Sequence, residues 1–175
     1  MNPVGLNVAT GSYVRGQARL RKAVGDQAAF MAWADTMPPG SPSHVDVPYA
    51  FKAHAIEAAR LAGYDIILWA DSSILPIAPL NLLFERIERE GYWISRNGYR
   101  NSEWTCAAAY QLLGVTHEEN HEIEHVVATA FGLNVNHPKG AAIFADYMRF
   151  AKNGAFRGPW RGGIGVQHRH DQTGL

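Results

Sequence analysis

Short apolar runs alternate with longer stretches of helical periodicity along most of the chain. The apolar runs predict strands at residues 4–10, 28–34, 66–71, 92–95 and 124–134. Apolar positions at helical spacing, bounded in several cases by proline or glycine, predict helices at residues 14–24, 48–62, 79–90, 104–113 and 138–153. This alternation predicts a single three-layer α/β domain with a mostly parallel sheet.

The run Ile-Ile-Leu-Trp-Ala-Asp at residues 66–71 is the most apolar short stretch, and it predicts a strand buried on both faces. Asp71 stands at its carboxyl end, the edge at which open α/β sheets bind ligands. Ser72 and Ser73 follow it, so the group suits a metal ion or a phosphate-bearing ligand. Aspartate and serine also cap turns, and this plainer interpretation stays open.

Two further segments are predicted near the same edge. The turn Thr-Gly-Ser-Tyr at residues 10–13 joins the first strand to the first helix, which would present backbone N–H groups there. It matches no full phosphate-loop pattern, so an ordinary turn is the alternative. Lys52 follows a proline-rich loop at residues 35–48 and is either solvated or directed at a phosphate.

Gly132 interrupts the apolar run of the last predicted strand. It predicts that this strand passes close to a ligand or another backbone.

Composition limits the classes of protein. The chain has 175 residues, of which 47% are hydrophobic and 18% charged, enough for one domain with a core. Its 16 basic and 16 acidic residues cancel, which argues against a global field that recruits nucleic acid or a membrane. Cys106 is the only cysteine, so an intramolecular disulfide is excluded. No run approaches the roughly 20 apolar residues of a membrane span, and we expect a cytoplasmic protein.

The tail at residues 154–175 differs in composition from residues 1–153. It is rich in glycine and arginine, contains Trp160 and ends in His-Arg-His-Asp-Gln at residues 168–172. Such a segment has little capacity to form a core, so it is either disordered or wraps over the domain and contributes to a site. We expect it to fold back, with a side chain from this cluster within roughly 10 Å of the Asp71 carboxylate.

The segment His117-Glu118-Glu119-Asn120-His121 matches the two-histidine signature of zinc proteases, and His125 continues the spacing. A zinc hydrolase is therefore one alternative. However, Thr116 and Glu119 form a capping box, and the residues between the histidines are polar, which is typical of a solvated helical turn. We expect that these histidines do not form a metal site.

Several motifs in this order resemble a poorly characterised bacterial and phage-associated group of nucleotide-sugar-dependent glycosyltransferases of the A-type fold. That group carries Trp-x-Asp-Ser-Ser and His-Asp-Gln motifs. The matching positions are Ala9 to Tyr13, Gly16-Gln17, Arg19-Leu20, Pro48 to Lys52, Trp69 to Ser73, Asn97-Gly98, Glu103-Trp104, Phe131 to Asn134 and His168 to Gln172.

The resemblance implies a nucleotide-sugar donor and a carbohydrate or other hydroxyl acceptor. It implies a donor site formed by Ala9, Thr10, Gly11, Tyr13, Arg19, Lys52, Asp71, Ser72 and Ser73. Asp71 would be the remaining carboxylate of an Asp-x-Asp motif, since Ser73 stands at the second position, and with His170 it would hold Mn²⁺ or Mg²⁺. Asp71 and Asp171 would be catalytic, with Asp171 as the base. A non-catalytic relative that binds a nucleotide sugar or a carbohydrate is the alternative.

Overall fold

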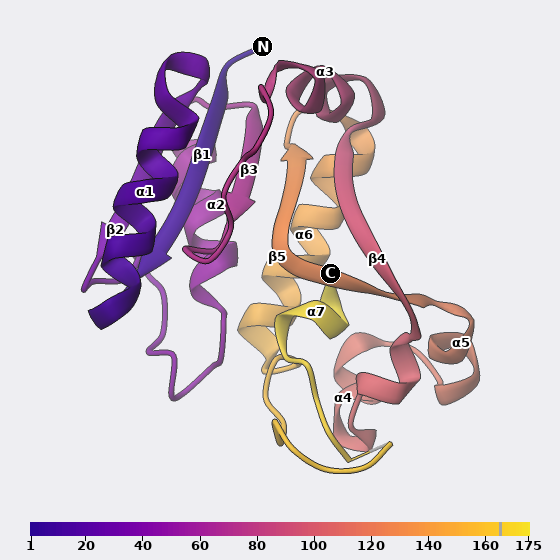
Figure 1. Ribbon diagram of the computed structural model, residues 1–175. Coiled ribbons are helices and arrows are strands. Elements are labelled where there is room, and N and C mark those ends of the chain that lie inside the picture. Colours follow the sequence, from indigo (N-terminus) through magenta and orange to yellow (C-terminus); the bar gives the residue numbers. More distant parts are fainter. Residues whose placement is uncertain (165) are drawn as a thin grey trace.

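The computed structural model describes residues 1–164 and 166–175, and a five-stranded sheet runs through its centre (Figure 1). The strand order is β2-β1-β3-β5-β4. Their bounds are β1 Pro3–Ala9, β2 Ala29–Ala34, β3 Ile66–Ala70, β4 Tyr92–Arg100 and β5 Glu124–Asn134. The expected α/β domain is confirmed.

The sheet is mixed, so the prediction of a mostly parallel sheet holds only for β2, β1 and β3. β1 pairs in parallel with both of its neighbours, whereas β5 is antiparallel to β3 and β4. A parallel return requires a long crossover that packs on the sheet. Between β4 and β5 the chain forms the short helices α4 (Ala107–Leu113) and α5 (His117–Glu122), which lie beyond the end of the sheet, so β5 runs back beside β4 (Figure 1).

Helices cover both faces of the sheet, as the three-layer prediction requires (Figure 1). α1 (Val14–Val24) and α3 (Asn81–Glu90) pack on one face, and α2 (Phe51–Leu61) and α6 (Pro138–Asn153) pack on the other. All five residues of β3 are buried. Alternate residues of this strand enter the two apolar clusters, with Leu68 on the α1 side and Trp69 on the α2 side. In the described part of the chain, no helix has the length and hydrophobicity to cross a membrane.

Three local predictions are corrected. The strand predicted at residues 92–95 continues to Arg100 in β4, although register shifts interrupt its pairing with β5. Trp104 belongs to the 3₁₀ turn η3 (Asn101–Trp104), and the helix after it begins only at Ala107. A Cβ atom at Gly132 would collide with the side chain of Ile87 on α3. The close neighbour of β5 at that point is therefore a core side chain and not a ligand.

The tail folds back over the domain and ends in the short helix α7 (Asp171–Gly174) (Figure 1). Its Phe156 is fully buried in the main apolar cluster, so the tail contributes more to the core than its composition indicated. His168, His170 and Asp171 are also buried. Two further 3₁₀ turns complete the chain, η1 (Gly11–Tyr13) and η2 (Gly25–Gln27).

Candidate functional site

A cleft of about 450 Å³, here called the Asp71 cleft, opens at the carboxyl ends of β1 and β3. This edge of a parallel pair is where an open α/β sheet leaves a crevice. Aromatic rings form part of the walls, and an aspartate with two serines forms the polar end. The lining residues are Val8, Ala9, Thr10, Tyr13, Met37, His44, Tyr49, Phe51, Asp71, Ser72 and Ser73.

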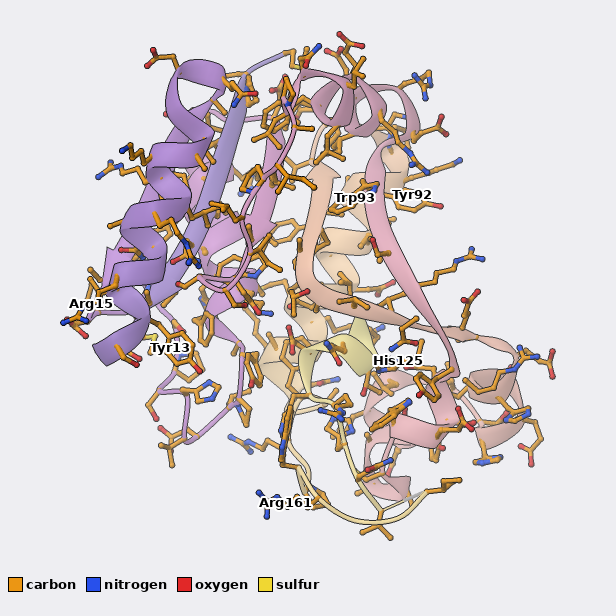
Figure 2. All side chains as sticks on the ribbon, viewed as in Figure 1. Tyr13, Arg15, Tyr92, Trp93, His125 and Arg161 are labelled. Carbon is orange, nitrogen blue, oxygen red and sulfur yellow. The ribbon has the colours of Figure 1, made fainter. Side chains whose placement is uncertain are left out.

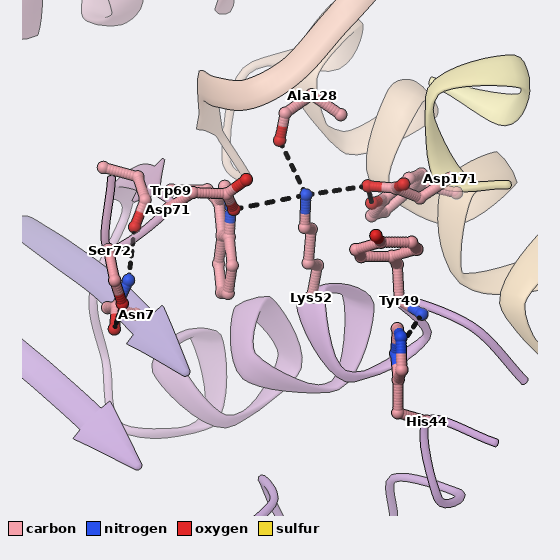
Figure 3. Close-up of polar contacts among 11 residues, drawn as sticks. Asn7, His44, Tyr49, Lys52, Trp69, Asp71, Ser72, Ala128 and Asp171 are labelled. Atoms are coloured by element: carbon pink, nitrogen blue, oxygen red, sulfur yellow. Dashed lines mark hydrogen bonds and ion pairs between the residues drawn. The ribbon is translucent and has the colours of Figure 1, made fainter. Parts of the chain in front are cut away.

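Asp71 is held by the strand that it follows and by neighbouring side chains (Figure 3). Its backbone N–H donates to the carbonyl oxygen of Thr129 at 2.8 Å. Its Oδ1 accepts a hydrogen bond from Nε1 of Trp69 at 2.7 Å and lies 3.4 Å from Nζ of Lys52. The side chain is 30% exposed, so the carboxylate is accessible from the cleft while its orientation is fixed.

Lys52 lies in the first turn of α2, and its ammonium group is buried between two carboxylates (Figure 3). Nζ is 2.9 Å from Oδ2 of Asp171 and donates to the carbonyl oxygen of Ala128 at 2.7 Å. Burial lowers the pKa of Lys52, but Asp171 and Asp71 raise it by more, so the amine stays protonated. Because Lys52 contacts Asp71, helix α2 begins at the carboxyl edge of the sheet, as expected. Lys52 does not line the cleft itself and contacts it through Asp71.

Asp171 is the first residue of α7, and its Oδ2 also accepts a hydrogen bond from the hydroxyl of Tyr147 at 3.3 Å. The expected approach of the tail is confirmed, because Asp171 and Asp71 contact the same ammonium group. Burial raises the pKa of the Asp171 carboxyl, an effect that Lys52 opposes. Because this side chain is only 4% exposed and lies outside the cleft lining, it does not reach an acceptor there. Its role as base stays a prediction, and the partners that the structure gives it are Lys52 and Tyr147.

His170 does not suit the predicted role of metal ligand. It is buried, its Nδ1 donates to the carbonyl oxygen of Phe156 at 2.8 Å, and its ring stacks on Trp160 at 5.4 Å between centroids. Among the described residues, no three histidine, cysteine, aspartate or glutamate side chains are grouped to hold a metal ion. Asp71 alone fits a cation that completes its shell with phosphate oxygens and water, as Mg²⁺ commonly does.

A buried hydrogen-bond network of the Asn7 and Gln17 side-chain amides supports the turn after β3, and it was not predicted from the sequence. Asn7 donates through Nδ2 to the carbonyl oxygen of Ala70 at 2.6 Å, and its Oδ1 accepts from Ser72 Oγ at 3.1 Å and Gln17 Nε2 at 2.9 Å. A Cβ atom at Gly16 would collide with the carbonyl oxygen of Ser72, so α1 sits directly on this turn. The available signal was Asn7 itself, a polar residue inside an apolar strand.

The other predicted donor-site residues divide into two groups. Ala9, Thr10, Tyr13, Ser72 and Ser73 line the cleft with Asp71. Gly11 and Arg19 do not: the Gly11 N–H donates to Oδ1 of Asp35 at 2.7 Å, and Arg19 is exposed on α1, with Nη2 3.5 Å from the carbonyl oxygen of Ser72.

Cleft residues from the proline-rich loop were also missed, because loop conformation carries little periodic signal. These are Met37 and His44, and Tyr49 lies just beyond them, before α2 begins. Its φ of 61° is strained for a residue with a side chain, and φ is also positive at Asp35 and His170 near the same edge. The ring of Tyr49 lies 5.2 Å from Nζ of Lys52 and forms part of the cleft wall.

Of the three histidines in the zinc-protease pattern, His121 and His125 bond to other side chains, and the ring of His117 stacks on that of His121 at 6.2 Å between centroids. Helix α5 begins at His117 and carries the predicted capping box of Thr116 and Glu119. Nδ1 of His121 lies 2.9 Å from Oγ of Ser102. His125 is buried in β5, where its Nδ1 accepts a hydrogen bond from Nδ2 of Asn97 at 2.8 Å (Figure 2).

Comparison with known proteins gives a fold likeness only. No protein-family model matches the sequence, and no curated protein matches it. One similar solved structure is a glycosyltransferase involved in the glycosylation of the major capsid of PBCV-1, with 9% identity and a TM-score of 0.45 over 83% of this chain and 66% of that one. Another is A197 from STIV, with 14% identity and a TM-score of 0.42 over 78% of this chain and 66% of that one. This chain thus spans just under two thirds of either protein, and neither likeness assigns a family or an activity.

Proposed function

We propose that the chain binds a nucleoside diphosphate sugar in the Asp71 cleft and transfers the sugar to a hydroxyl acceptor. The observation that carries this proposal is the Asp71 carboxylate, fixed at the end of β3 yet accessible in a cleft with aromatic walls. The rings of Tyr13, Tyr49 and Phe51 offer apolar surface to a planar base. The diphosphate would then lie toward Asp71 and its two serines.

Charge in the cleft supports a cation-assisted mode of binding. Among the described residues that line it, none is lysine or arginine, and Asp71 is itself an anion. A diphosphate beside Asp71 therefore requires added positive charge. A bound Mg²⁺ or Mn²⁺ would supply that charge to the departing diphosphate, with Asp71 as its protein ligand.

Lys52 and Asp171 position Asp71 for this role. Lys52 stays protonated between its two carboxylates, so it holds Oδ1 of Asp71 on the protein side. Asp171 holds Lys52 from the opposite side at 2.9 Å. Asp71 is therefore the group that touches the ligand, whereas Asp171 and Lys52 act through it.

A non-catalytic relative that only binds the nucleotide sugar is the second candidate. The burial of Asp171 favours it, because sugar transfer also needs a base for the acceptor proton. Among the described lining residues, Asp71 is the only carboxylate. Such a protein would bind the donor without turning it over.

Calorimetry with UDP, GDP and CDP sugars, with and without Mn²⁺, tests the proposal. We expect Asp71→Asn to weaken cation-dependent binding by about 10- to 100-fold, as for the loss of a charged interaction. Asp146→Asn is the matched control, since Asp146 pairs with Arg149 on the surface of α6. Release of sugar from a bound donor separates the enzyme from the binding protein. Absence of binding to every donor would refute both.

A further inference from the structure

The outer side of α1 is a local concentration of positive charge in a chain of zero net charge. The helix contains four basic residues and no acidic residue. Arg15, Arg19 and Lys22 are exposed and follow one another at helical spacing, so they lie along one side, opposite the buried Leu20 and Val24. Figure 2 shows Arg15 pointing away from the sheet.

The segment between β3 and α3 lies on the same face of the sheet as α1 (Figure 1). In this segment Ile77 is 97% exposed and Leu75 is also exposed, and Leu82 in the first turn of α3 is 71% exposed. This segment packs against α1: residues of both, including Leu20 and Pro76, line a common apolar cavity of about 160 Å³. Arg19 also reaches the carbonyl oxygen of Ser72 at the start of the segment.

We propose that this α1–α3 face, formed by Arg15, Arg19, Lys22, Leu75, Ile77 and Leu82, binds the surface of an anionic lipid membrane. Single exposed apolar residues need no explanation. The excess of positive charge comes from α1, because α3 carries three exposed glutamates and two exposed arginines. Three exposed apolar residues beside α1 favour a partner that is both apolar and negatively charged. A lipid surface has both properties, because apolar side chains enter the acyl boundary while basic residues meet anionic headgroups.

Charge also argues against the other occupants. A second copy that docks symmetrically about α1 would bring two acid-free helices together, and like charges repel. Nucleic acid would match the cations but leave Ile77 and Leu82 without an apolar partner. The inference does not depend on the proposed transfer activity, because it concerns a different surface from the Asp71 cleft.

Sedimentation with phosphatidylcholine vesicles, with and without phosphatidylserine, tests the inference on the intact protein. We expect binding only when phosphatidylserine is present, and weaker binding at high salt. Arg15→Ala with Lys22→Ala should reduce affinity about 25-fold, since each basic residue near such a surface contributes about fivefold. Ile77→Ser with Leu82→Ser should also reduce affinity for the vesicles.

Matched controls lie on the opposite face of the sheet. Leu61→Ser on α2 changes a leucine of similar exposure, 72%, and Lys139→Ala with Lys152→Ala removes two exposed cations from α6. These variants should bind as the wild type does. Equal binding to neutral vesicles, no binding, or an equal loss in the controls would overturn the inference. So would self-association, measured by light scattering, that is abolished by Ile77→Ser.

Discussion

The buried ammonium group of Lys52 pairs with a carboxylate on each of two sides, and the two carboxylates differ in their exposure to solvent. On the cleft side, Asp71 lies 3.4 Å from Lys52 and is partly exposed; on the tail side, Asp171 lies 2.9 Å from it and is buried. A buried carboxylate depends on its partners for stabilisation, whereas an accessible one is also stabilised by water. The same pairing therefore makes Asp171 part of the fold and leaves Asp71 available to a ligand.

The two sides are also supported differently. On the cleft side, Asn7 and Gln17 fix the turn after β3 through side-chain amides. On the tail side, His168 and His170 donate to the backbone carbonyls of Ala155 and Phe156 and so tie residues 168–171 to the end of α6. Changes on the tail side should therefore affect stability, and changes on the cleft side should affect ligand binding.

Lys52→Met should have the largest effect, because it removes the group that the two sides share. The variant leaves Asp171 buried without a counter-charge and the Ala128 carbonyl oxygen without its donor. We expect the free energy of unfolding at pH 7 to fall by about 3–5 kcal/mol, as when one partner of a buried ion pair is lost. Urea denaturation followed by circular dichroism measures this difference.

Lys139→Met is the control for this change, since Lys139 is exposed near the start of α6. It should alter the free energy of unfolding by less than about 0.5 kcal/mol. If Lys52→Met were as mild as its control, the ammonium group would not hold the two sides together.

Acid should destabilise the protein through two buried histidines, His168 in the tail and His125 in β5. Burial lowers the pKa of His168 from 6.5 to about 4, and it does the same for His125. A depressed pKa gives stability that is present above pH 6.5 and is lost as the pH falls through 4. Each histidine should therefore remove about 3 kcal/mol from the free energy of unfolding between pH 7 and pH 4.

His168→Gln isolates one of these contributions, because a glutamine amide can still donate to the Ala155 carbonyl oxygen. The variant should lose about 3 kcal/mol less than the wild type over this pH range. Asp171, whose pKa burial raises, acts with the opposite sign in both proteins and cancels in the comparison.

The sequence predicted those parts of the molecule that local patterns determine. The bounds of α1, α6 and β5 agree with the prediction, because apolar periodicity and terminal proline or glycine residues mark them. Asp71 at the carboxyl edge of a buried strand followed from the same kind of pattern. The approach of the tail followed from its unusual composition.

The direction of β5 and the burial of Asp171 were not predicted, because both depend on packing between residues that are distant in the sequence. The direction of β5 depends on where α4 and α5 lie, and no local pattern records that. The burial of Asp171 depends on Tyr147 and Lys52, which are distant in sequence. The resemblance implied that Asp171 is the base, whereas in the fold its carboxylate is a buried partner of Lys52.

Asp71→Asn should have the smallest effect on stability and so sharpens the contrast between the two carboxylates. Its side chain is partly solvated, Lys52 keeps Asp171, and the asparagine oxygen can still accept from Trp69 Nε1. We expect the free energy of unfolding to change by less than about 1 kcal/mol, as for exposed ion pairs. Asp171→Asn should cost about 1–3 kcal/mol, because it weakens buried hydrogen bonds to Lys52 and Tyr147. Both variants are measured by urea denaturation at pH 7. Equal losses would mean that burial does not distinguish the cleft side of Lys52 from its tail side.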